Sequence, residues 1–257
     1  MMITAGIDIG SITAKAAVMA EGKIRGTRVI FTGYNAEQAG TKVYEELLKE
    51  LGIEKSDIRR VVSTGYGRNS VKFMDKAMTE IICHGAGAYY LNPRARSVID
   101  IGGQDSKAIV LDEKGKVKNF AMNDKCAAGT GRFLEVMARA LEVDLDGFGA
   151  LSLRAGDPSR ISSLCTVFAE SEVISLISKG EKRENIIAGI HESIAARIAA
   201  MANRLRIAPL VVMTGGVAKN IGVVKALERK IGMAVEVSEY AQVNGAIGAA
   251  FLATGLK

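Results

Sequence analysis

Two short segments of the sequence place an aspartate directly before a glycine turn. Asp8 opens the segment DIGSITAKAAVM and Asp100 opens the segment DIGGQDSKAIVL, and the two agree at Asp, Ile, Gly, Lys, Ala and Val in the same register. Such a turn leaves backbone N–H groups free to bind phosphate oxygens, and the aspartate can act on the magnesium ion that accompanies a nucleotide. One copy alone is more typical of a capped surface turn, whereas two copies facing each other across a cleft would hold a triphosphate from both sides.

A third glycine-rich segment, TGGVAKN at residues 214–220, follows an apolar stretch at 210–213. A buried strand that ends at a glycine pair and opens a helix brings backbone N–H groups close to a ligand, although an ordinary strand-to-helix turn has the same pattern. The segment NGAIGAA at residues 244–250 is expected in a terminal helix. The sequence has no G-x-x-x-x-G-K-[ST] loop, which excludes a P-loop enzyme.

Two of the three cysteines precede predicted helices. Cys126 lies in MNDKCAAGTGRFLEVMA and Cys165 in SSLCTVFAESEVISLISKG, and the dipole stabilises a thiolate at a helix N-terminus. Iron–sulfur clusters usually take four thiolates, so two symmetry-related chains would hold one four-iron, four-sulfur cluster between them. Alternatively, Cys126 and Cys165 are simply small residues packed in the core. The remaining cysteine, Cys83, is interpreted as core packing beside a hydrogen-bonded His84. His191 falls on another helix, so no zinc site is expected.

The composition is that of a soluble α/β protein. Of 257 residues, 48% are hydrophobic and 24% charged, and the net charge of +6 is spread along the chain without a nucleic-acid-binding motif. No apolar run approaches the roughly 20 residues that span a bilayer, and the first residues lack signal-peptide features. We therefore expect a cytoplasmic protein with no membrane or nucleic-acid partner, in which three cysteines do not indicate disulfides.

The two aspartate segments predict two halves of similar design. Each half is expected to open with a strand, a glycine turn, a second strand, a tight turn and a third strand. We predict a first lobe at residues 1–95 and a second lobe at residues 96–241, with the final helix, about 242–257, packed back on the first lobe. Periodicity and capping patterns predict further helices at 35–51, 78–90, 187–205 and 216–230, and further strands at 61–64, 210–213 and 234–237.

The order of these motifs resembles the phosphate-1, phosphate-2 and adenosine motifs of the actin/Hsp70/hexokinase superfamily. The resemblance implies a two-lobed, ribonuclease H-like α/β ATPase fold with internal duplication, which binds ATP and Mg²⁺. It implies that Asp8 and Asp100 act through magnesium and water, and Asp100 or Gln104 is the candidate for orienting the attacking water. The residues expected to bind the nucleotide are Gly10, Ser11, Ile12, Thr13, Lys15, Gly102, Gly103, Gln104, Gly215, Gly216, Val217 and Asn220.

Over essentially its whole length the chain resembles the activators of 2-hydroxyacyl-CoA dehydratases, most specifically in NDKCAAGTGRF, CTVFAESEVISLISKG and TGYGRNS. The resemblance implies a homodimer in which Cys126 and Cys165 hold one [4Fe–4S] cluster, reduced by ferredoxin or flavodoxin. It also implies ATP-driven transfer of an electron to a transiently bound dehydratase. Ile12 departs from the G-S-T loop usual in that family, which leaves open which hydroxyl meets the phosphate. The sequence does not identify the acyl-CoA, nor whether the partner is a related reductase.

Two other functions fit the same predicted fold. A small-molecule kinase would use Asp105 as the base for a substrate hydroxyl, and a nucleotide-gated regulatory or scaffold protein would bind ATP with neither cluster nor electron partner. Both leave Cys126 and Cys165 without a role. The cysteine motifs therefore favour the activator.

Overall fold

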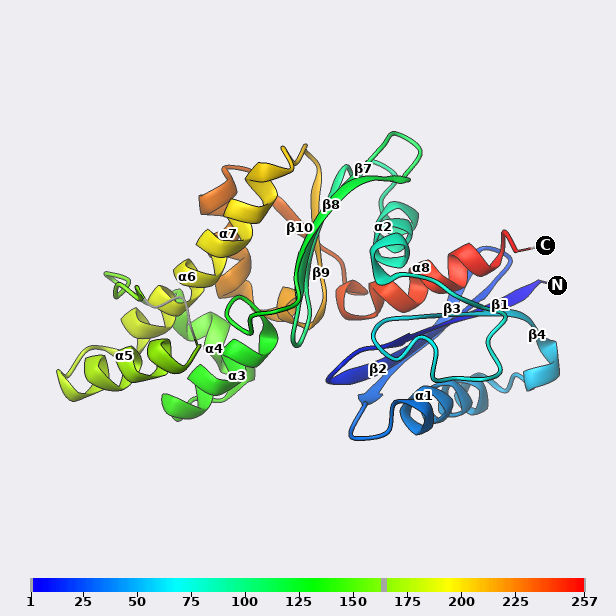
Figure 1. Ribbon diagram of the computed structural model, residues 1–257, viewed down its shortest axis with the longest axis horizontal. Coiled ribbons are helices and arrows are strands. Elements are labelled where there is room, and N and C mark those ends of the chain that lie inside the picture. Colours follow the sequence, from blue (N-terminus) through cyan, green and yellow to red (C-terminus); the bar gives the residue numbers. More distant parts are fainter. Residues whose placement is uncertain (1, 163–165, 257) are drawn as a thin grey trace.

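The computed structural model describes residues 2–162 and 166–256 (Figure 1). Its strands form two sheets that follow one another along the chain. The first sheet contains β1 (Ile3–Ile9), β2 (Thr13–Ala20), β3 (Lys23–Phe31), β4 (Ile58–Thr64) and β5 (Lys76–Ala77). The second contains β6 (Ser97–Ile101), β7 (Ser106–Leu111), β8 (Val117–Asn123), β9 (Val211–Thr214) and β10 (Val235–Val237).

The two sheets have the same topology. The strand order is β3-β2-β1-β4-β5 in the first and β8-β7-β6-β9-β10 in the second. β1 pairs antiparallel with β2 and parallel with β4, and β6 pairs in the same two ways with β7 and β9. The internal duplication expected from the two aspartate segments is therefore confirmed as a repeated strand arrangement.

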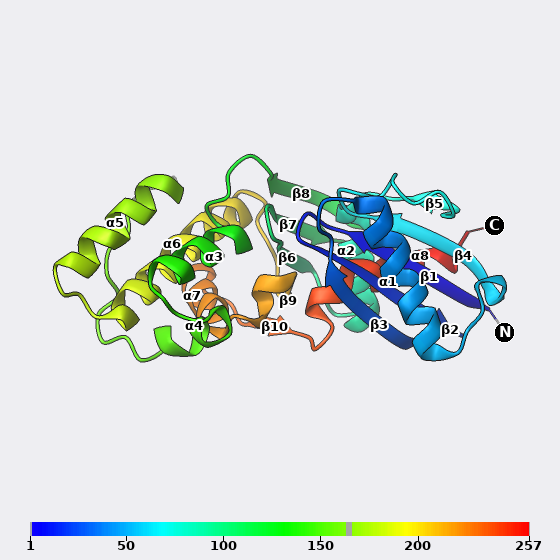
Figure 2. The ribbon, with the colours of Figure 1, turned by 90° about the horizontal axis from the view of Figure 1, so that it is seen from below.

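Helices cover both faces of each sheet. α1 lies on one face of the first sheet and α8 on the other, while α2 lies against the second sheet and packs along α8. Figures 1 and 2 show this α2–α8 pair between the two sheets, with both chain termini at the end of the molecule that holds the first sheet. The helices are α1 (Ala36–Leu51), α2 (Glu80–Leu91), α3 (Gly131–Ala140), α4 (Leu145–Ser152), α5 (Thr166–Ser178), α6 (Arg183–Arg204), α7 (Ile221–Ile231) and α8 (Asn244–Ala253). Short 3-10 turns are η1 (Lys55–Asp57), η2 (Gly216–Lys219) and η3 (Ala241–Val243).

Local sequence signals explain where α1 begins and ends. Asn35 caps its N-terminus by accepting a hydrogen bond from the Gln38 backbone N–H at 3.0 Å, and Gly52 ends it in the left-handed conformation. Between them, Val43 and Leu47 recur at helical spacing and are buried against the first sheet. The helix predicted from these residues is confirmed.

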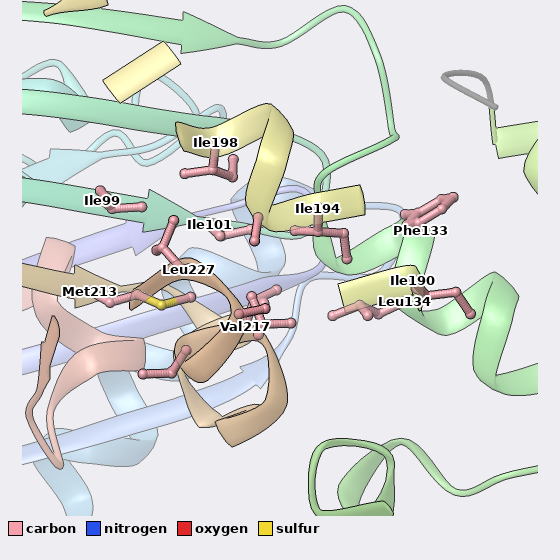
Figure 3. Packing of buried hydrophobic residues seen from close by; sticks show 14 of the residues in the cluster. Ile99, Ile101, Phe133, Leu134, Ile190, Ile194, Ile198, Met213, Val217 and Leu227 are labelled. Carbon is pink, nitrogen blue, oxygen red and sulfur yellow. The ribbon is translucent and has the colours of Figure 1, made fainter. Parts of the chain in front are cut away.

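The larger core lies under the second sheet. β6 is buried on both faces: Ile99 packs toward α6 and α7, whereas Val98 packs toward α2, as expected for a parallel strand covered by helices on both sides. Figure 3 shows Ile99 and Ile101 meeting Ile194 and Ile198 of α6. This packing fixes the end of β6, where Asp100 lies.

Two predicted helix starts are corrected. After the glycine pair the chain makes the 3-10 turn η2, and α7 begins only at Ile221 because Asn220 caps it by accepting from the Val223 N–H at 3.1 Å. α3 begins at Gly131 rather than directly after Cys126. In the described part of the chain, no helix combines the length and the apolar character needed to cross a bilayer.

Candidate functional site

A cleft of about 490 Å³ lies between the loops that follow β1, β6 and β9. Apart from Gln104, which is exposed, every residue predicted to act on or bind the nucleotide lines this cleft. Those residues are Asp8, Gly10, Ser11, Ile12, Thr13, Lys15, Asp100, Gly102, Gly103, Gly215, Gly216, Val217 and Asn220. Segments at least 200 residues apart in sequence, those at 8–15 and 215–220, are thus brought to one site.

The first two strands of each sheet carry an aspartate and a lysine opposite each other. Asp8 faces Lys15 in the register of β1 and β2, and Asp100 faces Lys107 in that of β6 and β7. Lys15 Nζ lies 3.3 Å from Asp8 Oδ2, and Lys107 Nζ lies 3.2 Å from Asp100 Oδ2. The duplication therefore provides the cleft with two equivalent cross-strand ion pairs.

Lys107 has more partners than its counterpart. Its ammonium group also lies 2.8 Å from Asp105 Oδ1 and 3.8 Å from Glu80 Oε1, and its side chain is only 2% exposed. Burial alone would lower the pKa of Lys107, but the carboxylates of Asp100, Asp105 and Glu80 raise it above its usual value. Lys107 is therefore a permanent cation at the floor of the cleft.

Asp100 is held in place from three directions. Besides Lys107, Thr214 Oγ1 donates a hydrogen bond to Asp100 Oδ1 at 2.8 Å, and His84 Nδ1 lies 3.2 Å from the same oxygen. Burial would raise the pKa of Asp100, but His84, Lys107 and Thr214 together hold it well below its ordinary value. The backbone carbonyl of His84 accepts from Asn244 Nδ2 at 2.9 Å, which ties this carboxylate to α2 and α8.

A second repeated feature is a glycine with a positive φ directly after β4 and directly after β9. Gly65 follows Thr64 and Gly215 follows Thr214, and the two glycines have φ values of +85° and +88°. A side chain at either position would be strained, and a Cβ on Gly215 would lie 2.3 Å from the Ile101 carbonyl oxygen. Both turns therefore require glycine, and each lets the chain approach the end of the neighbouring Asp-bearing strand.

The charges of the cleft fit a magnesium nucleotide. Six carboxylates and three ammonium groups line it: those of Asp8, Glu80, Asp100, Asp105, Glu135 and Asp146, and those of Lys15, Lys107 and Lys219. Among the described residues, no three His, Cys, Asp or Glu side chains converge as a complete metal-ligand shell. Mg²⁺ does not require one, because it usually binds through one or two carboxylates, water and substrate phosphates. The donor set therefore suits magnesium that arrives with ATP.

Another part of the cleft is mainly apolar. Leu134 of α3, Gly149 of α4 and Val217 of η2 line it, together with the first turn of α7 at Asn220 and Ile221. Figure 3 shows Leu134 and Val217 packed beside the core of the second sheet. Apolar walls with a few placed polar groups suit the base and sugar of a nucleotide.

Cys126 lies away from the cleft, in the loop between β8 and α3. It is half-buried, its backbone carbonyl accepts from Asn123 Nδ2 at 2.9 Å, and Arg197 Nη1 lies 4.0 Å from its sulfur. Cys126 does not directly precede α3 as predicted, because the helix begins five residues later, at Gly131, with Thr130 as its N-cap. The neighbouring guanidinium nevertheless suits a thiolate ligand. Cys165 falls outside the described residues.

The other two predictions from single residues are confirmed. Cys83 is fully buried, and burial raises the pKa of its thiol to about 12, as fits a packing residue. His84 is a hydrogen-bonded helix residue, but one directed at Asp100. Lys107 was not predicted as a site residue, although the aligned repeat places it opposite Asp100 in the same way that Lys15 is placed opposite Asp8.

The duplicated sheets and the cleft between them define a nucleotide-binding protein of the actin/hexokinase-like fold. A ROK family glucokinase from Streptomyces griseus, solved with glucose and AMPPNP, has that fold: the TM-score is 0.61 at 15% identity, over 99% of this chain and 100% of that chain. The predicted fold class is thereby confirmed. A likeness at this identity concerns the fold alone.

The chain belongs to the BadF/BadG/BcrA/BcrD ATPase family, whose model matches residues 5–253. It is 50% identical over 253 residues, 98% of this chain and 97% of the relative, to the activator of lactoyl-CoA dehydratase from Anaerotignum propionicum. The crystal structure of component A of the (R)-2-hydroxyglutaryl-CoA dehydratase of Acidaminococcus fermentans has a TM-score of 0.96 at 46% identity, over 99% of this chain and 98% of that chain. The family and these relatives support ATPase activity, and the predicted resemblance is confirmed.

Proposed function

We propose that this protein is an ATP-dependent activator that passes an electron from a shared iron–sulfur cluster to a 2-hydroxyacyl-CoA dehydratase. The observation that carries the proposal is a cleft with two equivalent Asp–Lys pairs in a chain whose second half also presents a half-buried cysteine beside a guanidinium. The names of the relatives, an activator and a dehydratase component, support the same function.

The cleft would hold ATP between its two aspartate turns. The N–H groups of Gly10 and Gly102 are bonded within their own turns, so those of Ser11, Ile12 and Gly103 would be offered to the phosphates. Asp8 and Asp100 would face the magnesium ion through water. Asp100 is fixed in its ionised form, so it is our candidate for orienting the attacking water. Gln104 is exposed and does not line the cleft, which makes it the weaker candidate.

The cluster would lie between two copies of the chain. Cys126 and Cys165 would each contribute a thiolate, and the same two cysteines of a second copy would complete a set of four in a homodimer. A [4Fe–4S] cluster supplies a site that stores and releases one electron; ferredoxin or flavodoxin is the proposed donor. Within this chain, the guanidinium of Arg197, 4.0 Å from the Cys126 sulfur, would place a positive charge beside the cluster.

Coupling between the cleft and the partner would follow from the two lobes, which we place at residues 1–95 and 96–241, with the final helix on the first lobe. α2 packs against the second sheet and α8 against the first, and the two helices contact each other. Closure around ATP would move one sheet relative to the other through this pair. Because Cys126 follows a strand of the second sheet, that motion would reposition the cysteine loop.

An assay of ATP-dependent activation tests this function. Protein prepared without air, mixed with a reduced ferredoxin, ATP and a 2-hydroxyacyl-CoA dehydratase, is expected to switch on dehydration, and omission of ATP is expected to abolish the effect. Activation that proceeds equally well without ATP would contradict the proposal. The kinase alternative is disfavoured, because Asp105, its proposed base, is buried in an ion pair with Lys107.

A further inference from the structure

His191 lies in the middle of α6 and does not line the nucleotide cleft, yet it contacts two segments that do. Its side chain is 1% exposed, and its ring meets Phe148 of α4 edge-on at a centroid distance of 5.5 Å. Nδ1 lies 3.0 Å from Ser152 Oγ, and Nε2 lies 3.2 Å from Asn220 Nδ2. A buried histidine with a polar partner on each ring nitrogen has a defined orientation.

The hydrogen bonds around His191 determine its tautomer. The Val223 N–H donates to Asn220 Oδ1 at 3.1 Å, so the Asn220 amide must turn its NH₂ group toward His191. Nε2 is therefore an acceptor and Nδ1 carries the hydrogen, which it donates to Ser152 Oγ. Ser152 in turn donates to the Gly149 carbonyl oxygen at 2.7 Å. One directed chain thus runs from Asn220 through His191 and Ser152 to Gly149.

Both ends of this chain are walls of the cleft. Asn220 and Gly149 line its apolar part, and they lie so close together that a Cβ on Gly149 would stand 2.6 Å from Asn220 Oδ1. The space around the ring is equally restricted, since a Cβ on Gly222 would stand 2.4 Å from His191 Nδ1. His191, which lies outside the cleft, therefore fixes the distance between Asn220 and the Gly149 segment of α4.

Burial keeps the ring in the state that the chain needs. It lowers the pKa of His191 to about 3, so the imidazole stays neutral at physiological pH. A protonated ring would place an N–H group against the Asn220 NH₂ group, and relief of that clash would require the amide to turn and give up its cap on α7.

We propose that His191 is a positioning residue for the nucleoside part of the nucleotide: its neutral Nδ1–H form holds Asn220 and the α4 wall at the spacing that accepts the base and sugar. This inference rests on the proposed ATP site. It assigns no contact between His191 and ATP, and it leaves the ion pairs at the phosphate end of the cleft untouched.

Two amide substitutions separate the roles of the two ring nitrogens. In His191→Gln the amide reaches about as far as Nε2 and can still accept from Asn220, whereas in His191→Asn it reaches only to about Nδ1 and can bond only Ser152. Both variants lose the edge contact with Phe148, so they are matched for packing. Steady-state ATP hydrolysis by the whole protein, with thermal unfolding of each variant, is the measurement.

We expect His191→Asn to raise the KM for ATP roughly five- to tenfold with kcat within about twofold of the parent, because one positioning hydrogen bond is lost and the reacting phosphate is not affected. His191→Gln keeps the bond to Asn220 and loses only the link to α4, so it should raise the KM less, by about two- to threefold. Ser152→Ala breaks the same link to α4 and should raise the KM to a similar extent, which gives a second test should His191→Asn fail to fold.

A loss of kcat with unchanged KM, or equal KM values for the two amide variants at similar melting temperatures, would overturn the inference and assign His191 to core stability alone. An unchanged KM in Ser152→Ala would do the same. A parent protein that hydrolyses no ATP would instead defeat the proposed function on which the inference rests.

Discussion

Lys107 Nζ lies 3.2 Å from Asp100 Oδ2, and the two residues stand directly opposite each other on β6 and β7. The same pairing occurs between Lys15 and Asp8 in the first sheet, at 3.3 Å. An ammonium group beside each carboxylate balances part of its charge in a cleft that must also receive a triphosphate. The duplication of the chain is therefore expressed in the site as well as in the strands.

Replacement of Lys107 by methionine is expected to destabilise the protein strongly. The change leaves the buried Asp100 and Asp105 and the partly buried Glu80 without their shared cation, and the loss of one partner of a buried pair costs on the order of 3–5 kcal/mol. Lys15→Met is the matched control, since among the described residues Lys15 pairs with the carboxylate of Asp8 alone and its side chain is 14% exposed. Urea unfolding monitored by circular dichroism measures both. Equal losses in the two variants would contradict the assigned importance of the Lys107 cluster.

Asp100→Asn is expected to reduce the turnover of ATP at least about a hundredfold, because the group that would place the attacking water loses its charge. Binding of ADP should change much less, and the iron content should be retained. Gln104→Ala, at an exposed position outside the cleft, should keep turnover within about threefold of the parent. The reverse order of effects, measured by phosphate release, would transfer the role to Gln104.

The two phosphate turns meet at Ile12 and Gly103. A Cβ added to Gly103 would lie 2.5 Å from Ile12 Cδ1, so Gly103→Ala is expected to hold the turns apart and weaken ATP binding by roughly tenfold, a change of about 1.4 kcal/mol. The double variant Ile12→Ala, Gly103→Ala removes the clash and should recover most of the affinity. Calorimetric titration with a non-hydrolysable ATP analogue gives the comparison. No recovery in the double variant would show that the alanine acts through something other than Ile12.

His191 gives the stability of the protein a defined pH dependence. Burial, modified by Glu192 and Arg229, lowers its pKa to about 3, whereas an unfolded histidine has a pKa of about 6.5. Below about pH 6.5 the unfolded chain binds a proton that the folded chain does not, so stability decreases as the pH falls, by up to about 1.4 kcal/mol for each pH unit. His191→Gln should lose this contribution. Parallel decreases for parent and variant between pH 7 and pH 5 would contradict the assignment.

The fold and the phosphate end of the site could be predicted because they are repeated. The aligned Asp8 and Asp100 segments predicted two similar sheets, and the sheets were confirmed. The same alignment pairs Lys15 with Lys107, but it gives no indication that Glu80, from a helix between the repeats, reaches the same ammonium group. That contact depends on how α2 packs against the second sheet.

The start of α7 was missed although its signal is local. Asparagine is a preferred N-cap, and the side chain of Asn220 caps α7 in this way. The prediction instead began the helix directly after the glycine pair, which is too early. The link between Asn220 and His191 has no such signal, because it joins residues 29 positions apart through the packing of α6 and α7. Helical spacing places His191 on a buried face but does not indicate its partners.

The iron content of anaerobically purified protein tests the central claim most directly. We predict about two irons and two acid-labile sulfides per chain, which corresponds to one [4Fe–4S] cluster for two chains. Replacement of Cys126 by serine is expected to remove the iron or to separate the dimer into monomers. Cys83→Ser, at a buried cysteine of α2, should keep the iron. Parent protein without iron, or Cys126→Ser protein with its full complement, would contradict the account.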